Sequence, residues 1–314
     1  MPAIPVIIDC DPGQDDAVML LLALASPEAL DIRGVTAVAG NVPLALTARN
    51  ARLICELAGR NEVNVHAGCP RPLVREPITA EEVHGTTGID GFEIHEPGRP
   101  LSPQHAVDFI VDTLMAAAED SLTLVPTGPL TNVAMAMVKE PRIVPKIREI
   151  VLMGGALREG GNTTPAAEFN VLVDPHAAHV VFRCNRPITV MGLDVTHQAL
   201  TTPARLDAIR AIGNQAGRTV AAMLSFYSRH DVDKYGAPGA PLHDPCTIAY
   251  LLRPELFQGK SVNVEIEVGS ALTMGASVVD FWGVSGRPAN ATWVHSIEAD
   301  GFYDLLTERL GRLP

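Results

Sequence analysis

Residues 6–20 read Val6-Ile7-Ile8-Asp9-Cys10-Asp11-Pro12-Gly13-Gln14-Asp15-Asp16-Ala17-Val18-Met19-Leu20, and their pattern predicts a strand, a turn and a helix in succession. A strand points alternate side chains to one face, so its two acids share a face at its carboxyl end. A Pro-Gly turn follows, and two further acids open an apolar helix. Because ligands of open α/β sheets bind at the carboxyl ends of the strands, this segment predicts a site as well as a fold class.

Four carboxylates stand close together in this segment, at positions 9, 11, 15 and 16. The last two alone could simply complement the partial positive charge of a helix N-terminus. That explanation does not account for Asp9 and Asp11. Clustered carboxylates repel one another and raise each other's pKa unless a cation or strong hydrogen bonds neutralise them. The cluster therefore predicts a divalent metal site.

The donor set of this predicted site consists of oxygen atoms, which favours Ca²⁺ or Mg²⁺ over Zn²⁺. The segment is not an EF-hand, because a strand precedes it and Leu20 stands at the position where that loop carries Glu. Other parts of the chain must complete the shell. His243-Asp244 is the best partner, since it precedes an apolar helix with Pro245 at its first position. Asp244 could alternatively act only as the N-cap of that helix.

Outward from this segment, apolar runs alternate with helical patterns along nearly the whole chain, which favours βαβ units. We expect an α/β fold: a single Rossmann-like domain over residues 1–314 with a mostly parallel central sheet flanked by helices, plus additional C-terminal strands. The expected strands are 5–9, 32–38, 63–67, 122–126, 149–153, 188–193, 262–268, 277–282 and 292–297. The expected helices are 16–25, 44–57, 104–118, 130–138, 175–182, a helical region over 201–228, 245–252 and 302–310.

Two polar segments rich in Pro and Gly, residues 71–100 and 226–241, look like active-site flaps, because long loops of this kind commonly cover sites.

The composition is that of a globular protein and excludes several classes. With 24 Lys and Arg against 36 Asp and Glu the formal net charge is -12, so we expect no nucleic-acid partner and no anionic membrane surface. No apolar run reaches the ~20 residues of a spanning helix, and the N-terminus carries no basic signal region, which makes a cytoplasmic location the expectation. The 5 Cys, without CxxC spacing, indicate reduced thiols.

The sequence closely resembles the nucleoside hydrolase family, which comprises inosine-uridine preferring ribohydrolases and their pyrimidine-preferring relatives. The resemblance begins with the acidic segment and continues in family order across nearly the whole chain. It is carried by Ala39-Gly40-Asn41, His84-Gly85, Thr127-Gly128-Pro129-Leu130-Thr131-Asn132, Met153-Gly154-Gly155, Asn162, Glu168-Phe169-Asn170 and His243-Asp244. Met274 stands where the family often carries Arg.

The resemblance implies a Ca²⁺ shell and a ribose site. The implied metal ligands are Asp11, Asp16, the backbone carbonyl of Thr127, and Asp244. The positions that match ribose binding are Asp15, Asn41, Asn162, Glu168 and Asn170, with Met153 against the sugar and Phe169 beside them. The family also suggests a homodimer or homotetramer.

The implied reaction is hydrolysis of the N-glycosidic bond of ribonucleosides. By analogy with inverting glycoside hydrolysis, Asp11 would activate a water that attacks C1′ while an acid assists the departing base. Calcium would help to generate this nucleophile and orient the sugar hydroxyls. His243 is the expected acid because the usual pKa of imidazole is near neutral, and His84 is a second candidate in the base pocket. Phe226, Tyr227, His230, Asp231 and Tyr235 would face the base, which stays open between uridine, cytidine and inosine.

Two rival interpretations remain at this point. Asp9 and Asp11 also resemble the paired aspartates of a Mg²⁺-dependent phosphatase of the haloacid dehalogenase type, although Pro12-Gly13 and the Asn162 and Glu168 positions fit that family poorly. The other is a non-catalytic, Ca²⁺-dependent nucleoside-binding protein on a hydrolase scaffold.

Overall fold

The computed structural model describes the fold of residues 2–235 and 238–314, and the side chains of residues 2–229 and 238–314. Within these ranges nine strands form one sheet in the order β10-β9-β11-β6-β5-β4-β1-β2-β3. Their bounds are β1 Ile4–Cys10, β2 Leu30–Ala37, β3 Val65–Ala67, β4 Leu122–Pro126, β5 Ile147–Met153, β6 Ile188–Met191, β9 Phe257–Ile266, β10 Ser277–Asp280 and β11 Ala291–Ile297. The short strands β7 Leu200–Thr201 and β8 Ala240–Pro241 pair separately.

The sheet is parallel from β3 to β11, and β9 and β10 then pair antiparallel at its far edge. Strand β1 lies between β2, which follows it in sequence, and β4, which begins more than a hundred residues later. The winding direction of the sheet therefore reverses at β1. Such a switch point opens a crevice at the carboxyl ends of the strands, and β1 ends there with its acidic turn.

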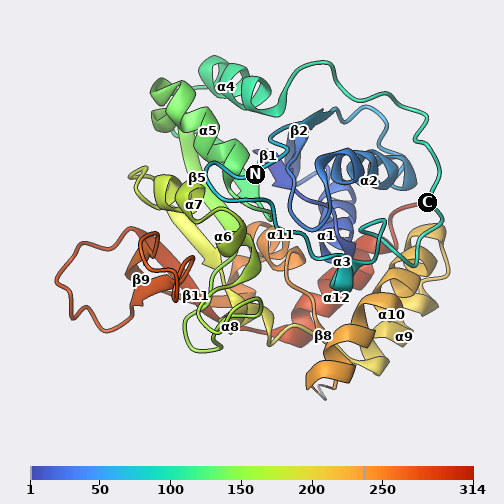
Figure 1. Ribbon diagram of the computed structural model, residues 1–314. Coiled ribbons are helices and arrows are strands. Elements are labelled where there is room, and N and C mark those ends of the chain that lie inside the picture. The colour runs from blue at the N-terminus through green and yellow to red at the C-terminus, as the bar shows by residue number, and fades with distance from the viewer. Residues whose placement is uncertain (1, 236–237) are drawn as a thin grey trace.

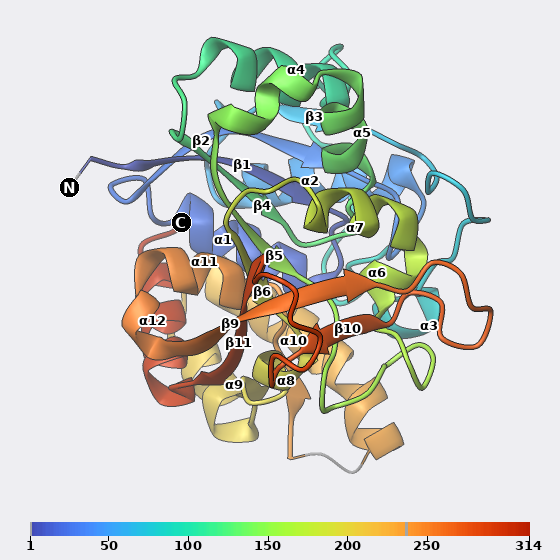
Figure 2. The same ribbon diagram turned by 90° about the vertical axis from the view of Figure 1, so that its left-hand side faces the viewer.

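Helices cover both faces of the sheet (Figure 1). Figure 2 shows α4, α5 and α7 on one face, and α1, α9, α10, α11 and α12 on the other. The bounds are α1 Gln14–Leu24, α2 Leu44–Leu57, α3 Glu81–His84, α4 Ala106–Ala116, α5 Thr131–Lys139, α6 Phe169–Val173, α7 Pro175–Phe182, α8 Leu193–Thr196, α9 Pro203–Ala211, α10 Gln215–Tyr235, α11 Pro245–Leu252 and α12 Ala299–Leu310, with 3-10 turns at Pro141–Lys146 and Pro254–Leu256.

Helix α1 is the centre of the larger apolar core. All 11 of its residues are buried, because α2, α10, α11 and α12 surround it on the sides that the sheet leaves open. A helix that is apolar on every side needs such an environment. Its first turn carries the acids: Asp16 accepts a hydrogen bond from the backbone N–H of Gly13 at 3.1 Å and so caps the helix. The core thus fixes the position of the acidic turn.

The expected α/β fold with a mostly parallel sheet and additional C-terminal strands is confirmed, and each expected strand corresponds to a strand of the sheet. The helical region expected over 201–228 is two helices, α9 and α10, separated at Gly213, whose positive φ of 80° ends a helix readily. The strand expected to reach Leu193 ends at Met191, and Leu193 begins α8. None of the described helices is both long and apolar enough to cross a membrane.

The two segments expected to be flaps differ in structure. Residues 226–235 continue α10, whereas residues 71–100 hold only the short helix α3. Within the latter segment, the backbone around Thr87 is tied to the core, because Asn50 Nδ2 donates to the carbonyls of Pro12 at 3.0 Å and Thr87 at 2.9 Å. These hydrogen bonds hold the backbone at Thr87 against the turn at Pro12. Movement of either segment over a ligand stays a prediction.

Candidate active site

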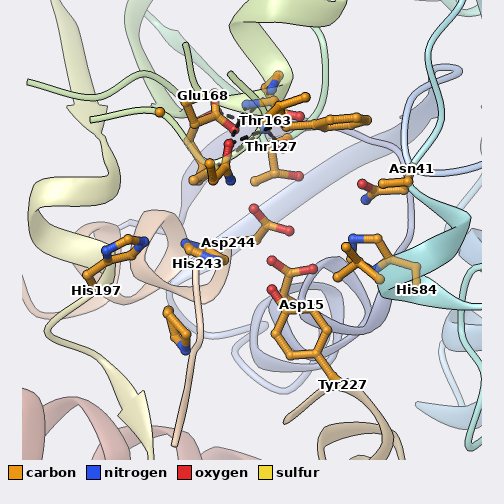
Figure 3. Close-up of a pocket in the computed structure, with 18 of the residues that line it drawn as sticks. Asp15, Asn41, His84, Thr127, Thr163, Glu168, His197, Tyr227, His243 and Asp244 are labelled. Atoms are coloured by element: carbon orange, nitrogen blue, oxygen red, sulfur yellow. Dashed lines mark hydrogen bonds between the residues drawn. The ribbon is translucent and has the colours of Figure 1, made fainter. Parts of the chain in front are cut away.

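A cavity of about 620 Å³ opens at the carboxyl ends of β1, β4 and β5, where the acidic turn lies (Figure 3). Most of the expected site residues line it: Asp15, Asn41, His84, Thr127, Met153, Asn162, Glu168, Phe169, Asn170, His243 and Asp244. Acidic side chains are frequent in this lining, and no Lys or Arg belongs to it among the described residues. Segments from Asp15 to Asp244 thus converge on one cavity.

Three carboxylates form the centre of the site. One oxygen atom each of Asp15, Asp16 and Asp244 lies within 4.8 Å of the others, and the three residues are buried. Among the buried oxygens of this region, Oδ1 of Asp11 and Oδ1 of Asp15 have no hydrogen-bond partner among the described residues. Buried acceptors without donors are costly, and oxygen atoms in this number are the ligands that hard divalent cations prefer. The donor set therefore fits a metal ion such as Ca²⁺.

The surrounding chain fixes the orientation of Asp11 and Asp16. The backbone N–H of Asn41 donates to Asp11 Oδ2 at 2.7 Å, and its side-chain amide donates to Asp16 Oδ2 at 3.2 Å. Thr127, directly after β4, donates its hydroxyl to the other oxygen of Asp16 at 2.8 Å. Residues that follow β2 and β4 thus hold one oxygen of Asp11 and both oxygens of Asp16.

Glycines leave room for Asp11 on both sides. A Cβ at Gly40 would lie 2.0 Å from Asp11 Oδ2, and a Cβ at Gly128 would lie 2.5 Å from Asp11 Oδ1. Both distances are far below van der Waals contact. The motifs Ala39-Gly40-Asn41 and Thr127-Gly128 therefore contain glycine because the Asp11 carboxylate occupies the adjacent space.

Burial and mutual repulsion raise the pKa values of these acids. Burial raises the pKa of Asp15 to about 7, with the Asp16 charge as the next cause. The pKa values of Asp11 and Asp244 are raised well above the usual range, again by burial first and by neighbouring carboxylates second. A bound cation would reverse these shifts because it favours the ionised form.

The opposite wall carries amide and carboxylate groups. Glu168 is buried at the start of α6, and its carboxylate accepts from the backbone N–H groups of Gly155 at 2.8 Å and Asn170 at 2.9 Å. Asn170 Nδ2 in turn donates to the carbonyl of Thr127 at 2.7 Å. Asn162 is exposed and accepts from the N–H of Phe169 at 3.0 Å. This wall can bind several hydroxyl groups of a ligand.

Imidazole rings lie on two sides of the acids. In Figure 3, His243 and His197 lie on one side of Asp15 and Asp244, and His84 lies with Tyr227 on the other. Nδ1 of His243 is 2.7 Å from the hydroxyl oxygen of Thr196, and its ring centre is 5.8 Å from that of His197. Burial lowers the pKa of His243 to about 3, helped by the two neighbouring imidazoles. In the fold, the pKa of His243 therefore lies below the near-neutral value expected for it, and the ring is uncharged at pH 7.

Sequence reasoning missed several residues around the cavity. Thr196 and His197 lie at the end of the four-residue helix α8, and His197 Nδ1 lies 3.0 Å from Glu159. No motif identified them, because only the order of the strands in the sheet brings the segment after β6 to the cavity. Gln14 lies within residues 6–20, yet the sequence does not indicate which residues its side chain hydrogen-bonds. The side chains of His230, Asp231 and Tyr235 lie outside the described residues, while Phe226 and Met274 do not line the cavity.

Asp9 is separate from the cavity. Its Oδ1 accepts hydrogen bonds from Thr36 at 2.5 Å and Asn132 at 2.8 Å, and the side chain is 1% exposed. A phosphatase of the haloacid dehalogenase type would need the first of the paired aspartates as an accessible nucleophile. The position of Asp9 therefore argues against that interpretation.

The chain is similar to known proteins in both sequence and fold. The family described as inosine-uridine preferring nucleoside hydrolase matches residues 6–304. An uncharacterised protein of Schizosaccharomyces pombe is 50% identical over 309 residues, covering 98% of this chain and 99% of its own. The pyrimidine-specific ribonucleoside hydrolase RihA of Photobacterium profundum is 48% identical over 307 residues, covering 98% of each chain. A solved purine-preferring ribonucleoside hydrolase from Gardnerella vaginalis superimposes with a TM-score of 0.90 at 33% identity over 98% of each chain.

Proposed function

This chain belongs to the inosine-uridine preferring nucleoside hydrolase family and is an enzyme of the nucleoside hydrolase class, and on that basis we propose that it is a calcium-dependent hydrolase of pyrimidine ribonucleosides. One observation carries the proposal: a single cavity combines buried carboxylates, a polar wall and three flanking imidazoles. The products would be ribose and the free base.

We propose that Asp11, Asp16, Asp244 and the backbone carbonyl of Thr127 hold the calcium ion. Carboxylate oxygens of Asp16 and Asp244 lie within 4.8 Å of each other, and the raised pKa values of Asp11 and Asp244 also support the assignment. When bound, calcium would lower the pKa of a coordinated water and orient the sugar hydroxyls. Asp15, Asn41, Asn162, Glu168 and Asn170 would bind the ribose, with Met153 and Phe169 beside it.

Asp11 is the proposed general base. Its Oδ2 is held by the N–H of Asn41, while Oδ1 has no hydrogen-bond donor among the described residues. Oδ1 would therefore accept a proton from the attacking water. Attack at C1′ on the face opposite the base breaks the N-glycosidic bond with inversion, as in other glycosidases that use an activated water. Glu168 and Asn170 would keep the sugar in place while positive charge develops on the ring.

His243 is the proposed hydrogen-bond donor to the departing base. Because the low pKa of His243 keeps the ring neutral, a single proton must be placed on the correct nitrogen. If the Thr196 hydroxyl donates to Nδ1, the proton resides on Nε2 and can be offered to the base. His84 would contact the base from the other side.

A pyrimidine base is the proposed substrate preference. Relatives described as pyrimidine-specific are 45–48% identical, whereas the solved purine-preferring enzyme is 33% identical. His84, Tyr227 and Tyr235 are the proposed base-pocket residues, and the Tyr235 side chain lies outside the described residues.

The test is release of ribose from uridine, cytidine, inosine and adenosine, measured by a reducing-sugar assay with and without a calcium chelator. We expect release from uridine and cytidine to exceed that from the purine nucleosides, and chelation to abolish it until calcium is restored. Faster release from inosine would reverse the proposed preference. Tight nucleoside binding without release, in protein loaded with calcium, would instead support the nucleoside-binding interpretation.

We also propose that residues 1–314 form one domain, and that the enzyme is a cytoplasmic homodimer or homotetramer. Light scattering during size-exclusion chromatography tests the assembly, since a mass of one chain would contradict it.

A further inference from the structure

Gln14 lies beside the catalytic acids but does not line the cavity. Its side chain is completely buried and makes all its hydrogen bonds to one short segment of the cavity wall. Nε2 donates to the backbone carbonyls of His84 at 2.9 Å and Asp90 at 3.2 Å, and Oε1 lies 2.7 Å from Nδ1 of His84. The helix α1 thus holds His84 by both its backbone and its ring.

These contacts determine which end of the Gln14 amide faces the ring. The two carbonyl oxygens only accept hydrogen bonds, so the amide nitrogen must face them and the amide oxygen must face His84. An amide oxygen cannot donate, which requires the proton on Nδ1 of His84. In the neutral ring Nε2 is then a hydrogen-bond acceptor.

The position of the ring is restricted as well. A Cβ at Gly13 would lie 2.4 Å from Nδ1 and 2.6 Å from Cε1 of His84, so this edge of the ring packs against the chain at Gly13. The ring also stacks with Tyr227 at a centroid distance of 5.6 Å and an interplanar angle of 27°. A half-turn of the ring about its Cβ–Cγ bond would put Cδ2 in the place of Nδ1 and break the bond to Gln14.

We propose that Gln14 is a positioning residue that fixes His84 in the Nδ1–H tautomer, so that His84 meets the nucleobase as a hydrogen-bond acceptor. This inference rests on the proposed function. The two histidines would then make complementary contacts with the base. His243 donates to the departing base, whereas His84 accepts from an N–H group. Uracil offers such a group at its ring and cytosine at its amine. A base without such a group on this side would lose the contact.

The first test reads the tautomer directly by ¹⁵N NMR of histidine-labelled, full-length protein without substrate, about two pH units above the usual imidazole pKa. We expect the His84 resonances, assigned with His84→Ala, to show the proton on Nδ1. Gln14→Met keeps the length of the side chain but removes the acceptor, so the tautomer should shift towards Nε2–H. A wild-type His84 with its proton on Nε2, or a spectrum that Gln14→Met leaves unchanged, would overturn the proposal.

The second test compares substrates. For Gln14→Met we expect kcat/KM to fall about tenfold more on uridine than on an activated nitrophenyl riboside, whose leaving group offers no N–H. Gln258→Met, at an exposed position on β9, is the matched control. Equal losses on both substrates would contradict a role through the base. If the wild type releases no ribose from any nucleoside, the proposed function fails while the tautomer result still stands.

Discussion

Asp11 is the residue on which the proposed chemistry depends most. Asp11→Ala removes both the general base and a metal ligand, so we expect kcat to fall by roughly 10²- to 10⁴-fold with a much smaller change in nucleoside affinity. Steady-state kinetics on uridine and calorimetric titration of a non-hydrolysed nucleoside analogue measure the two effects. Near-normal turnover of the variant would contradict the proposed mechanism.

His243 is expected to matter in proportion to how poorly the base leaves. His243→Ala should reduce kcat on uridine far more than on a nitrophenyl riboside, because the latter leaves without protonation. Thr196→Val, which removes the hydroxyl beside His243 Nδ1, should show the same pattern more weakly. Parallel losses on both substrates for His243→Ala would remove it from the leaving-group role.

At the residue scale the sequence predicted just over half of the cavity lining from short motifs, some of which, such as Thr127-Gly128, lie directly after a strand. It could not predict the environment of His243. The neutral state of this ring depends on burial and on His197 and His84, which come from distant parts of the chain. The partners of Gln14 were hidden for the same reason, since Asp90 follows it by 76 residues.

Among the elements, α1 connects the core to the site, and its packing is expected to govern stability. Leu21 is 0% exposed in this helix, so Leu21→Ala should lower the free energy of unfolding by about 2–5 kcal/mol through lost burial and a residual cavity. Denaturant titration measures the change. Leu272→Ala is the control, because Leu272 is 86% exposed and its truncation should cost less than about 0.5 kcal/mol. Similar effects for the two variants would contradict the described packing.

The sequence predicted long elements better than short ones. Strands such as β4 have the expected bounds because a parallel strand covered on both faces is a continuous apolar run. The helices α3, α6 and α8 have only 4, 5 and 4 residues, and their sequences carry too few periodic positions to indicate a helix. These short helices carry His84, Asn170 and Thr196, so the least predictable elements are the ones that shape the cavity.

For the whole molecule, the buried acids predict a dependence of stability on pH when metal is removed. A carboxyl whose folded-state pKa is raised, as for Asp15 from 3.8 to about 7, binds more protons in the folded than in the unfolded state. Its stabilising contribution is complete below about pH 4 and is lost as the pH rises towards 7. The metal-free protein should therefore have a lower Tm at pH 8 than at pH 5.

Bound calcium should reverse this loss, because the cation favours ionised carboxylates and binds only the folded site. Thermal unfolding at pH 5 and pH 8, in chelator and in excess calcium, measures both effects. We expect calcium to raise Tm more at pH 8 than at pH 5. Asp280→Asn, at a carboxylate outside the cavity, should leave the calcium effect intact. A Tm that calcium leaves unchanged at pH 8 would argue against a metal site.

The space between Gly40 and Gly128, which the Asp11 carboxylate occupies, limits the substitutions that this enzyme can tolerate. Neither glycine takes part in the reaction, yet any side chain at either position would occupy the space of the Asp11 carboxylate. In a library of random variants these two positions should therefore be as intolerant as the catalytic acids themselves. Attempts to redesign the base preference are best confined to the cavity walls that carry His84, His197 and His243, where substitutions leave the space around Asp11 unchanged.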